Sequence, residues 1–454
     1  MREIDMTQKE RLLISLLLAS FLTSFSSSSI NVALPMIGRE LSINSVTLSW
    51  ISTSYLLATS VLLLPLGRIS DILGRKKIYL LGIIIFSLGS LFTIFSKSIT
   101  FLLSSRVMQG IGASMIYATN TAILTTLYPE EKGKFLGLNV TAVYLGLSMG
   151  PVLSGVLIQN FPWKSIFFVS FILGIITFTL SITKDDEKTQ KGSIDFLGTF
   201  IYAISTILFL YGISRITDKI GVTFILLGIL GIISFFYREG RVKDPVFDVK
   251  LFSKNRLFLF SNISALINYG STSAISFLMS LYLQYIKNLP PQTTGIILLL
   301  QPMFQALLSP FAGRLSDRKD PGKIASVGMG IISLMLFSLS FIDNNTSIYI
   351  IIFALSTLGF GFALFSSPNT NAIMSSVDKN SYGIASSTLA TMRVIGQTLS
   401  MAIVTSIFSI ILKGEPIHSE SLSKFLLSTR TSFYIFTVLC IIGTFTSLIR
   451  NKSS

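Results

Sequence analysis

The chain has 454 residues, of which 50% are hydrophobic and only 13% are charged, and its mean hydropathy is +0.70. A soluble protein carries about 25% charged residues, so this composition excludes an ordinary soluble domain and favours a membrane protein. The formal net charge of +15 does not indicate a nucleic-acid partner, because the basic residues gather in alternate short loops between apolar stretches.

Apolar stretches long enough to cross a bilayer recur along the whole chain. A hydrocarbon core of about 30 Å requires about 20 helical residues, and backbone amides in lipid must find their partners within the helix. A basic N-terminal segment precedes the first stretch, which lacks a small-residue cleavage site, so a retained helix is expected rather than a removed signal peptide. The sequence predicts fourteen transmembrane helices, at residues 13–35, 46–66, 78–96, 100–127, 136–159, 165–183, 195–213, 220–237, 257–284, 292–310, 323–342, 347–370, 382–412 and 431–449.

The distribution of basic residues predicts the orientation. The N-terminus, every second loop and the C-terminus together hold 25 of the 36 Lys and Arg residues. The positive-inside rule therefore places both termini in the cytoplasm of a multi-pass protein of the cell membrane. The single cysteine, Cys440, lies in the last helix, and the single histidine, His418, is expected to be exposed in an outer loop. No disulfide, metal site or cofactor is expected.

An internal repeat indicates how the helices are grouped. GRISDILGRKK begins at Gly67 and GRLSDRKDPGK begins at Gly313, 246 residues later, each between the second and third helix of a block. The repeat predicts an all-α membrane protein in which helices 1–6 (residues 1–190) and helices 9–14 (residues 251–454) form related six-helix bundles. Residues 191–250 would add an inserted pair, flanked by flexible links at 184–192 and 237–245. Such repeats are typical of transporters with a site at mid-membrane.

The repeated loop is the first candidate functional motif. Gly67 is expected to end the second helix, and Asp71 to lie before the third, where a carboxylate interacts favourably with the helix dipole. Gly74 and Arg75 follow, and Gly313 and Asp317 are the corresponding residues of the second copy. The loop would hold the two halves together in one state and release them in the other. The alternative is a basic loop that only fixes topology.

Two helices of the first block carry further motifs. SRVMQGIGAS places Arg106 about 10 Å into the membrane at 1.5 Å per residue, where a cation requires polar partners. The next helix, which also contains Gly137, has small residues that allow close backbone approach and a proline that bends it. We expect these residues to seal one side of the protein, with plain helix packing as the alternative: Gly146, Gly150, Pro151 and Gly155.

These motifs resemble those of the major facilitator superfamily. The loop is similar to G-x-(L/I)-(A/S)-D-x-x-G-R-(K/R)-(K/R), the Arg106 segment to R-x-x-Q-G-x-G-A, and the following helix to the element typical of exporters. Fourteen helices, with SINVALP, WKSIFF, IDFLGT, LYLQ and SPNTNAIM, resemble the drug:proton antiporters of that size over nearly the whole chain. The resemblance implies roles in coupling for Arg106 and Asp71. Ile72 stands where the family has a basic residue, so one salt bridge is not expected.

A second departure concerns the first helix. The stretch before N-V-A-L-P commonly reads L-D-x-T in that subfamily, and here Ser26 and Ser28 occupy the aspartate and threonine positions. No Asp or Glu lies well inside any predicted helix; Asp195 is at a helix start, and Asp71 and Asp317 are expected in loops. Serine neither attracts a cation nor carries a proton as a buried carboxylate does.

The predicted cavity is therefore polar without acids. We expect it to prefer neutral or anionic amphiphiles, with Arg393 of helix 13 joining Arg106, and Asn139 and Tyr144 as further polar side chains; helix–helix hydrogen bonding is the alternative role for each. The candidate cavity residues are Ser26, Ser28, Asn31, Asn120, Asn268, Gln301, Gln305, Asn369, Arg393 and Gln397.

The sequence predicts a secondary active exporter that works by alternating access, with a small molecule and protons as partners, in membrane lipid, as a monomer. A facilitator or importer of a neutral or anionic metabolite is an alternative, and a membrane sensor with a closed core is a remoter one. An enzyme is not expected, because the sequence has no nucleophile–histidine pairing, metal-ligand cluster or phosphate-cradling loop.

Overall fold

A computed structural model describes residues 6–183, 194–242, 245–247, 249–378 and 382–449, and its regular structure over these ranges is entirely helical. The expected link at 184–192 lies outside the described residues. The first six helices are α1 (Met6–Glu40), α2 (Ser45–Leu73), α3 (Arg75–Ile94), α4 (Ile99–Leu127), α5 (Lys132–Asn160) and α6 (Ser165–Ser181). Next come α7 (Phe196–Ser214), α8 (Lys219–Glu239) and the short α9 (Val249–Lys254).

The rest of the chain contains a broken segment followed by long helices. The broken segment consists of α10 (Arg256–Thr272), α11 (Ile275–Leu281) and the π-helical turn η1 (Tyr282–Ile286). It is followed by α12 (Pro291–Arg318), α13 (Pro321–Leu339), α14 (Ile348–Ser375), α15 (Tyr382–Ile411) and α16 (Leu422–Ile449).

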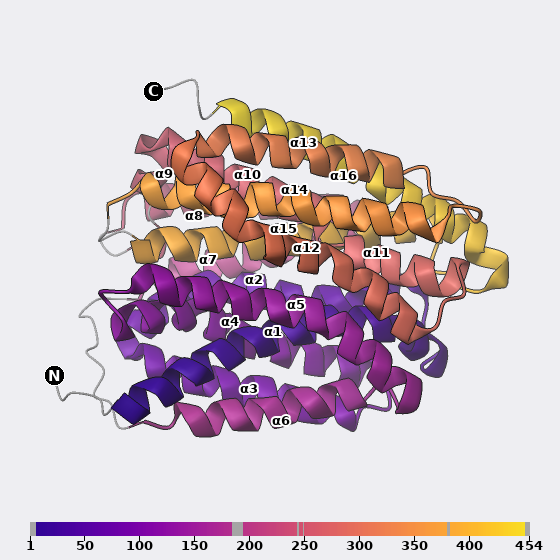
Figure 1. The fold of residues 1–454 in the computed structure, drawn as a ribbon, viewed down its shortest axis with the longest axis horizontal. Helices are drawn as coiled ribbons and strands as arrows, with labels where there is room; N and C mark the ends of the chain where they lie inside the picture. Colours follow the sequence, from indigo (N-terminus) through magenta and orange to yellow (C-terminus); the bar gives the residue numbers. More distant parts are fainter. Residues whose placement is uncertain (1–5, 184–193, 243–244, 248, 379–381, 450–454) are drawn as a thin grey trace.

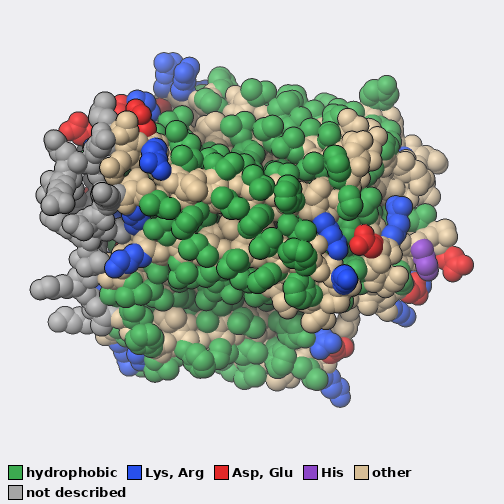
Figure 2. All heavy atoms as spheres, turned by 90° about the horizontal axis from the view of Figure 1, so that it is seen from below, with side chains coloured by type: hydrophobic (Ala, Val, Ile, Leu, Met, Phe, Trp, Pro, Cys, Tyr) green, Lys and Arg blue, Asp and Glu red, His purple; other side chains and the backbone are tan. Residues whose placement is uncertain are grey.

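The surface has the pattern expected of a membrane protein. Among the described helices, twelve are long and apolar enough to cross a bilayer, and α6 is a shorter apolar helix. In the face shown in Figure 2, hydrophobic side chains cover the middle of the molecule, whereas charged side chains gather toward its two ends. Lipid solvates such an apolar belt, and water solvates the charged ends.

The helices form two groups that meet along the length of the molecule (Figure 1). Helices α1–α6 make the first half, and α10–α16 make the second half. The start of α1 and the end of α16 lie at one end of the molecule, which we call the proximal end; the opposite end is the distal end. Helices α7 and α8 pack on each other, and α7 also packs against α2 of the first half and α15 of the second.

Contacts between the halves include a set at the distal end. Ser280 of the second half donates a hydrogen bond to the carbonyl of Asn31 (2.8 Å), and Gln284 donates to that of Val32 (3.1 Å). The backbone N–H of Ser45 donates to the carbonyl of Glu415 (3.3 Å). These bonds hold α1 and α2 against α11, η1 and the loop after α15.

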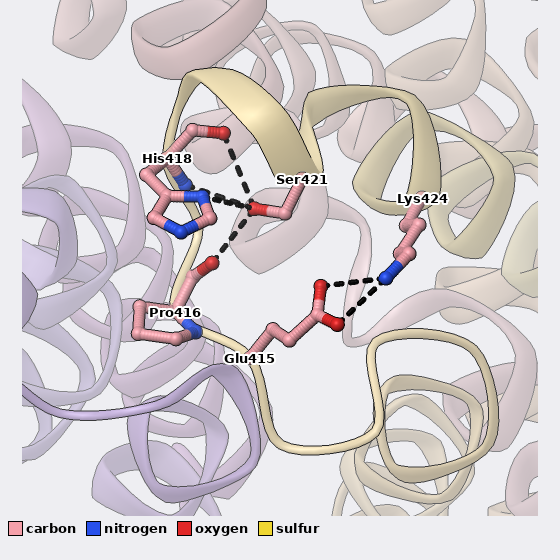
Figure 3. Close-up of polar contacts among 5 residues, drawn as sticks. All are labelled: Glu415, Pro416, His418, Ser421 and Lys424. Carbon is pink, nitrogen blue, oxygen red and sulfur yellow. Dashed lines mark hydrogen bonds and ion pairs between the residues drawn. The ribbon is translucent and has the colours of Figure 1, made fainter.

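That loop is itself ordered by polar contacts (Figure 3). Glu415 pairs with Lys424 at 2.6 Å, and the Ser421 hydroxyl donates to the Pro416 carbonyl and contacts Nδ1 of His418 at 3.0 Å. The hydrogen-bonding ammonium group of Lys424 lowers the pKa of the Glu415 carboxyl. His418 is exposed, which confirms the exposure predicted from the sequence.

The structure corrects three local predictions. Gly67 does not end the second helix: α2 continues through Asp71 to Leu73, and Gly74, with φ of 108°, makes the turn that a side chain would strain. Asp317 likewise lies in the last turn of α12 rather than in a loop. The predicted continuous helix at 257–284 is interrupted after Thr272, where the N–H of Ala274 bonds to the Ser400 hydroxyl (3.1 Å) instead of continuing the helical ladder.

Candidate functional site

Arg106 of α4 is completely buried in the first half and is satisfied by neutral groups. It donates to the carbonyl of Ile51 (3.1 Å) and to Oε1 of Gln109 (2.6 Å), and its guanidinium lies 4.5 Å from the centre of the Tyr55 ring. Ser26, at the position where the resembling family has aspartate, accepts a third bond from Arg106 at 3.4 Å. The positive charge is therefore solvated by dipoles and a ring face, and no carboxylate neutralises it among the contacts given for the described residues.

Ser28 has a different environment, in the packing of α1 on α5. Its hydroxyl donates to the carbonyls of Ser24 (3.1 Å) and Gly146 (3.3 Å). A methyl group on Gly150 would collide with this hydroxyl, and one on Gly146 would lie 2.9 Å from Cβ of Ser24. These two glycines therefore bring two helices of the same half together.

Pro151 and Gly155 of the same helix face the other half. A Cβ on Gly155 would lie 2.6 Å from the carbonyl oxygen of Pro291, and the corresponding atom on Gly295 would collide with the carbonyl of Pro151. The predicted sealing motif thus divides: its first glycines pack within a half, and its last residues make a close contact between α5 and α12 toward the distal end.

A set of polar side chains joins α5 to the second half near the middle of these helices. Tyr144 contacts the Ser366 hydroxyl at 3.1 Å and accepts a hydrogen bond from Gln305 at 3.1 Å. Arg393 donates to the Thr370 hydroxyl at 3.0 Å and lies 5.6 Å from the centre of the Tyr269 ring. We call these six residues the inter-half polar group: Tyr144, Tyr269, Gln305, Ser366, Thr370 and Arg393.

This group has free hydrogen-bonding capacity. Thr370 donates to the carbonyl of Ser366 at 2.8 Å, so one turn of α14 links Arg393 to Tyr144. The Nε atom of Arg393 is buried without a hydrogen-bond partner. Five helices therefore present phenols, an amide, hydroxyls and one guanidinium to one region, with a donor left over.

The other predicted cavity residues are dispersed. Asn31 accepts from the Ser52 hydroxyl (3.4 Å) in the first half. Asn120 donates to the Leu16 carbonyl and to Ser20, whose hydroxyl donates in turn to Asn139. Asn369 donates to the Ser261 carbonyl. Gln301 and Gln397 are partly buried.

Asn268 differs from these asparagines. It is fully buried in α10, four residues before the break, and neither its side-chain oxygen nor its nitrogen has a hydrogen-bond partner. An unpaired buried amide is costly in apolar surroundings, which marks it as a place where water or a ligand group would be stabilised.

The residues of the repeated loop pair within their own halves. Arg75 binds Asp71 at 2.7 Å and reaches the Thr126 hydroxyl of α4. Asn371 of α14 donates to Asp317 at 3.1 Å. Gly313 lies in α12, where a Cβ would meet the Ser367 hydroxyl at 3.0 Å. These contacts brace each half at the proximal end.

The sequence analysis did not predict a charged cluster at the proximal end of α7 and α8. Asp195 is the N-cap of α7, as expected from its position, but it also receives two hydrogen bonds from Arg238 of α8, at 2.8 and 2.9 Å. The hydrogen bonds from Arg238 lower the pKa of the Asp195 carboxyl. Glu239, assigned from the sequence to a loop, is the last residue of α8 and is 2% exposed. One sequence signal could have predicted this cluster. Asp195 stands at the start of one apolar helix, and Arg238 and Glu239 stand at the end of the next, so an antiparallel pair brings them to the same end.

Comparison with known proteins assigns the family. The family model described as Major Facilitator Superfamily matches residues 16–401 and 262–453. The chain is 32% identical over 445 residues to the riboflavin transporter RibZ of Clostridioides difficile, covering 96% of each protein. It is 26% identical to the multidrug resistance protein Stp of Mycobacterium tuberculosis, covering 84% of this chain and 72% of that protein.

The fold comparison agrees. A bacterial homologue of the human lysosomal transporter Spinster, solved in an inward-facing and unoccupied conformation, matches with a TM-score of 0.71 and 14% identity over 98% of this chain and 97% of that one. The resemblance inferred from the motifs is thereby confirmed at the level of the superfamily, and the prediction that the chain is not an enzyme is confirmed as well. The chain belongs to the major facilitator superfamily and is an integral, multi-pass membrane transporter of small molecules.

Proposed function

We propose that this chain is a secondary active transporter that carries a neutral or anionic amphiphile through the region between its halves. In this proposal the membrane domain has fourteen spans: the twelve long helices, α6, and the broken segment α10–η1. Residues 1–190 and 251–454 form two bundles, and residues 191–250 carry the inserted pair α7–α8. The protein works as a monomer in the cell membrane and has no nucleic-acid partner.

Matched helix contacts support a repeat relationship between the bundles. Gly146 of α5 packs on the backbone of Phe21 and Phe25 in α1, and Gly396 of α15 packs on that of Leu266 and Gly270 in α10. In both pairs one glycine meets residues four apart on the partner helix. Each bundle thus uses the same device to bring its first and fifth helices together.

The contacts between the halves at the distal end support an inward-facing state. The excess of basic residues in alternate loops favours placing the proximal end, with both termini, in the cytoplasm. The bonds from Ser280 and Gln284 to α1, and the contact of Gly155 with Pro291, then close the outer side. Alternation would require these contacts to separate while the halves approach each other at the proximal end.

The substrate class rests on one observation, the inter-half polar group. It offers a guanidinium with a spare donor, two phenol rings and an amide, and its contacts within the described residues include no carboxylate. A cation would be repelled by Arg393, whereas a planar neutral or anionic molecule would find rings to stack on and donors to bind. The similarity to a riboflavin transporter agrees, since riboflavin is a neutral, planar amphiphile.

A second candidate is a proton-coupled multidrug exporter. It is favoured by the close contact of Pro151 and Gly155 with α12, because export against a gradient requires a tight seal. Relatives named for multidrug resistance and for lincomycin resistance support it too; the latter, from Bacillus subtilis, is 24% identical over 409 residues.

Transport by the purified chain in lipid vesicles tests the proposal. The probes are riboflavin, its anionic phosphate ester, and a permanently cationic dye, each followed with and without an imposed pH gradient. We expect flux of the first two and little flux of the dye. Acceleration by the gradient would support proton coupling, and flux indifferent to it would assign a facilitator.

Two variants sharpen the test. Arg393→Gln should slow transport of the phosphate ester about 10- to 150-fold, since a hydrogen bond to a charged group contributes about 1.5–3 kcal/mol. Arg215→Gln removes an exposed guanidinium in the loop after α7 and should leave transport unchanged. Preferred transport of the dye, or an Arg393→Gln protein with wild-type rates, would refute the substrate class.

A further inference from the structure

The cluster at the proximal end of α7 and α8 contains a buried carboxylate oxygen that nothing satisfies. Oε2 of Glu239 accepts a hydrogen bond from the N–H of Phe247 at 2.8 Å, whereas Oε1 is buried and has no hydrogen-bond partner. An ionised carboxylate left in this condition would pay a large desolvation cost. The arrangement therefore calls for a positive group on Oε1.

A second carboxylate faces this oxygen across Gly198. An ideal Cβ on Gly198 would lie 2.5 Å from Oδ2 of Asp195 and 2.7 Å from Oε1 of Glu239. A side chain at position 198 would occupy the space between the two acids. Both oxygens therefore lie close to the same point beside the first turn of α7, where the residue is glycine.

Of the two carboxylates, Glu239 is the one expected to take a proton, because Arg238 already compensates the charge of Asp195. Arg238 binds both oxygens of Asp195, which also accepts the N–H of Gly198, so Asp195 is compensated. Asp195 and Arg238 are the charged groups that act on Glu239 among the described residues. The described residues contain no group of three or more metal-ligating side chains, so a proton satisfies Oε1 where a metal ion would lack ligands.

The cluster lies where the inserted pair touches both halves. Tyr202 of α7 donates to the Ser60 carbonyl of α2 at 3.0 Å. Phe247, the residue bonded to Glu239, contacts the rings of Phe236 (5.5 Å) and Phe252 (4.8 Å), and Phe252 contacts Phe258 of α10 at 5.1 Å between centroids. An unbroken set of aromatic contacts thus runs from α8 to the first helix of the second half.

We propose that Glu239 and Asp195 form a proton-binding site at the proximal end of the inserted pair, and that its occupancy controls how firmly α8 holds the connection to α10. The proton comes from the aqueous phase at that end, binds Oε1 of Glu239 and is shared with Oδ2 of Asp195. Release of the proton leaves two carboxylates facing each other with a single guanidinium. Their repulsion drives the end of α8 away from α7 and weakens the hydrogen bond between Glu239 and the N–H of Phe247.

Infrared difference spectroscopy of the full-length protein in vesicles tests the proton directly and requires no substrate. On acidification within the pH range above the ordinary glutamate pKa of about 4.3, the wild type should gain a protonated-carboxyl band. Glu239→Gln should lack that band. Glu415→Gln, which removes an exposed carboxylate at the distal end, should retain it. A wild type without the band, or Glu239→Gln with it, overturns the proposal.

A second variant and a second readout protect the test against misfolding of Glu239→Gln. Asp195→Asn frees Arg238 to pair with Glu239, so the band should move to lower pH; an unchanged band overturns the shared site. Hydrogen exchange at the Phe247 amide, corrected for the intrinsic pH dependence, should lose protection with rising pH in the wild type but not in Glu239→Gln. If hydrogen exchange at the Phe247 amide responded to Na⁺ at fixed pH but not to pH itself, the proposal of a proton site would also be overturned.

Discussion

A methyl group at Gly155 would act on the contact between α5 and α12 that we propose closes the distal end. The new Cβ would lie 2.6 Å from the Pro291 oxygen and 2.8 Å from Cα of Gln292, both backbone atoms of α12. Helix backbone yields little, so α5 and α12 must separate. Overpacking of this kind costs about 1–3 kcal/mol, and because it acts on a contact between the halves, the cost falls on the distally closed state.

Gly155→Ala should therefore shift the equilibrium between the distally closed and distally open states about 5- to 150-fold toward the open one. Distances between spin labels measure this shift. Labels attached to cysteines at Gln159 and Glu420, exposed distal positions of the two halves, require only that the single native cysteine be removed by Cys440→Ala. The variant should add a population with a longer distance.

Gly330→Ala is the matched control. It makes the same chemical change inside α13, where a Cβ would meet no atom within 4 Å. Its distance distribution should equal that of the parent. If Gly155→Ala also gave the parent distribution, the α5–α12 contact would not be the distal seal, and the assignment of Pro151 and Gly155 to gating would be wrong.

Three further predictions concern stability and accessibility. Glu40→Ala deprives the buried indole of Trp163 of its acceptor at 2.8 Å; thermal unfolding should show a loss of about 1.5–3 kcal/mol, and an unchanged midpoint would contradict this. Cys440, fully buried beneath Met329, should resist maleimide until the protein unfolds; stoichiometric labelling of the native protein, followed by mass spectrometry, would disprove its burial. Because Arg238 lowers the folded-state pKa of Asp195, their pair stabilises above the ordinary aspartate pKa of about 3.9 and ceases to do so as pH falls through the lowered value. Arg238→Met should therefore reduce the melting temperature more at pH near 7 than at pH near 3, and equal reductions would count against the pair.

Much of the architecture follows from patterns that depend on local sequence alone. Apolar length and helical hydrogen bonding predict the long helices, and the motif around Arg106 predicts a buried arginine with polar partners. The interruption after Thr272 was not predictable, because Thr272, Ser273 and Ala274 are not strong helix breakers. The break is instead stabilised from outside, by the Ser400 hydroxyl that accepts the N–H of Ala274.

The candidate site was less predictable for the same reason. Gln305 and Arg393 were recognised as polar residues in apolar helices, but Tyr269, Ser366 and Thr370 carry no such signal, since these residues are common in membrane helices. Only the packing of five helices places them together. Gly67 and Gly74 both suit a turn, and the sequence alone does not tell which has the positive φ.

Glu239 shows how a helix end changes a functional interpretation. From the sequence it lies in the charged link after the predicted helix at 220–237, where a carboxylate ordinarily contacts water. In the structure the backbone N–H of Phe247 bonds to its carboxylate and the side chain is buried, so the chain acquires a buried acid outside the inter-half polar group. In the two proposals, substrate charge and proton binding belong to different places: Arg393 between the halves, and Glu239 beside the inserted pair.

This separation determines how coupling would operate. Where one carboxylate binds both proton and substrate, the two compete directly, and removing it abolishes selectivity and pH dependence together. Here the two can be linked only through packing, by way of Phe247 and the aromatic contacts to α10. Glu239→Gln should then flatten the pH dependence of flux without changing the order of preferred substrates, whereas Arg393→Gln should change that order and leave the pH dependence intact. Variants that altered both properties together would refute two separate sites.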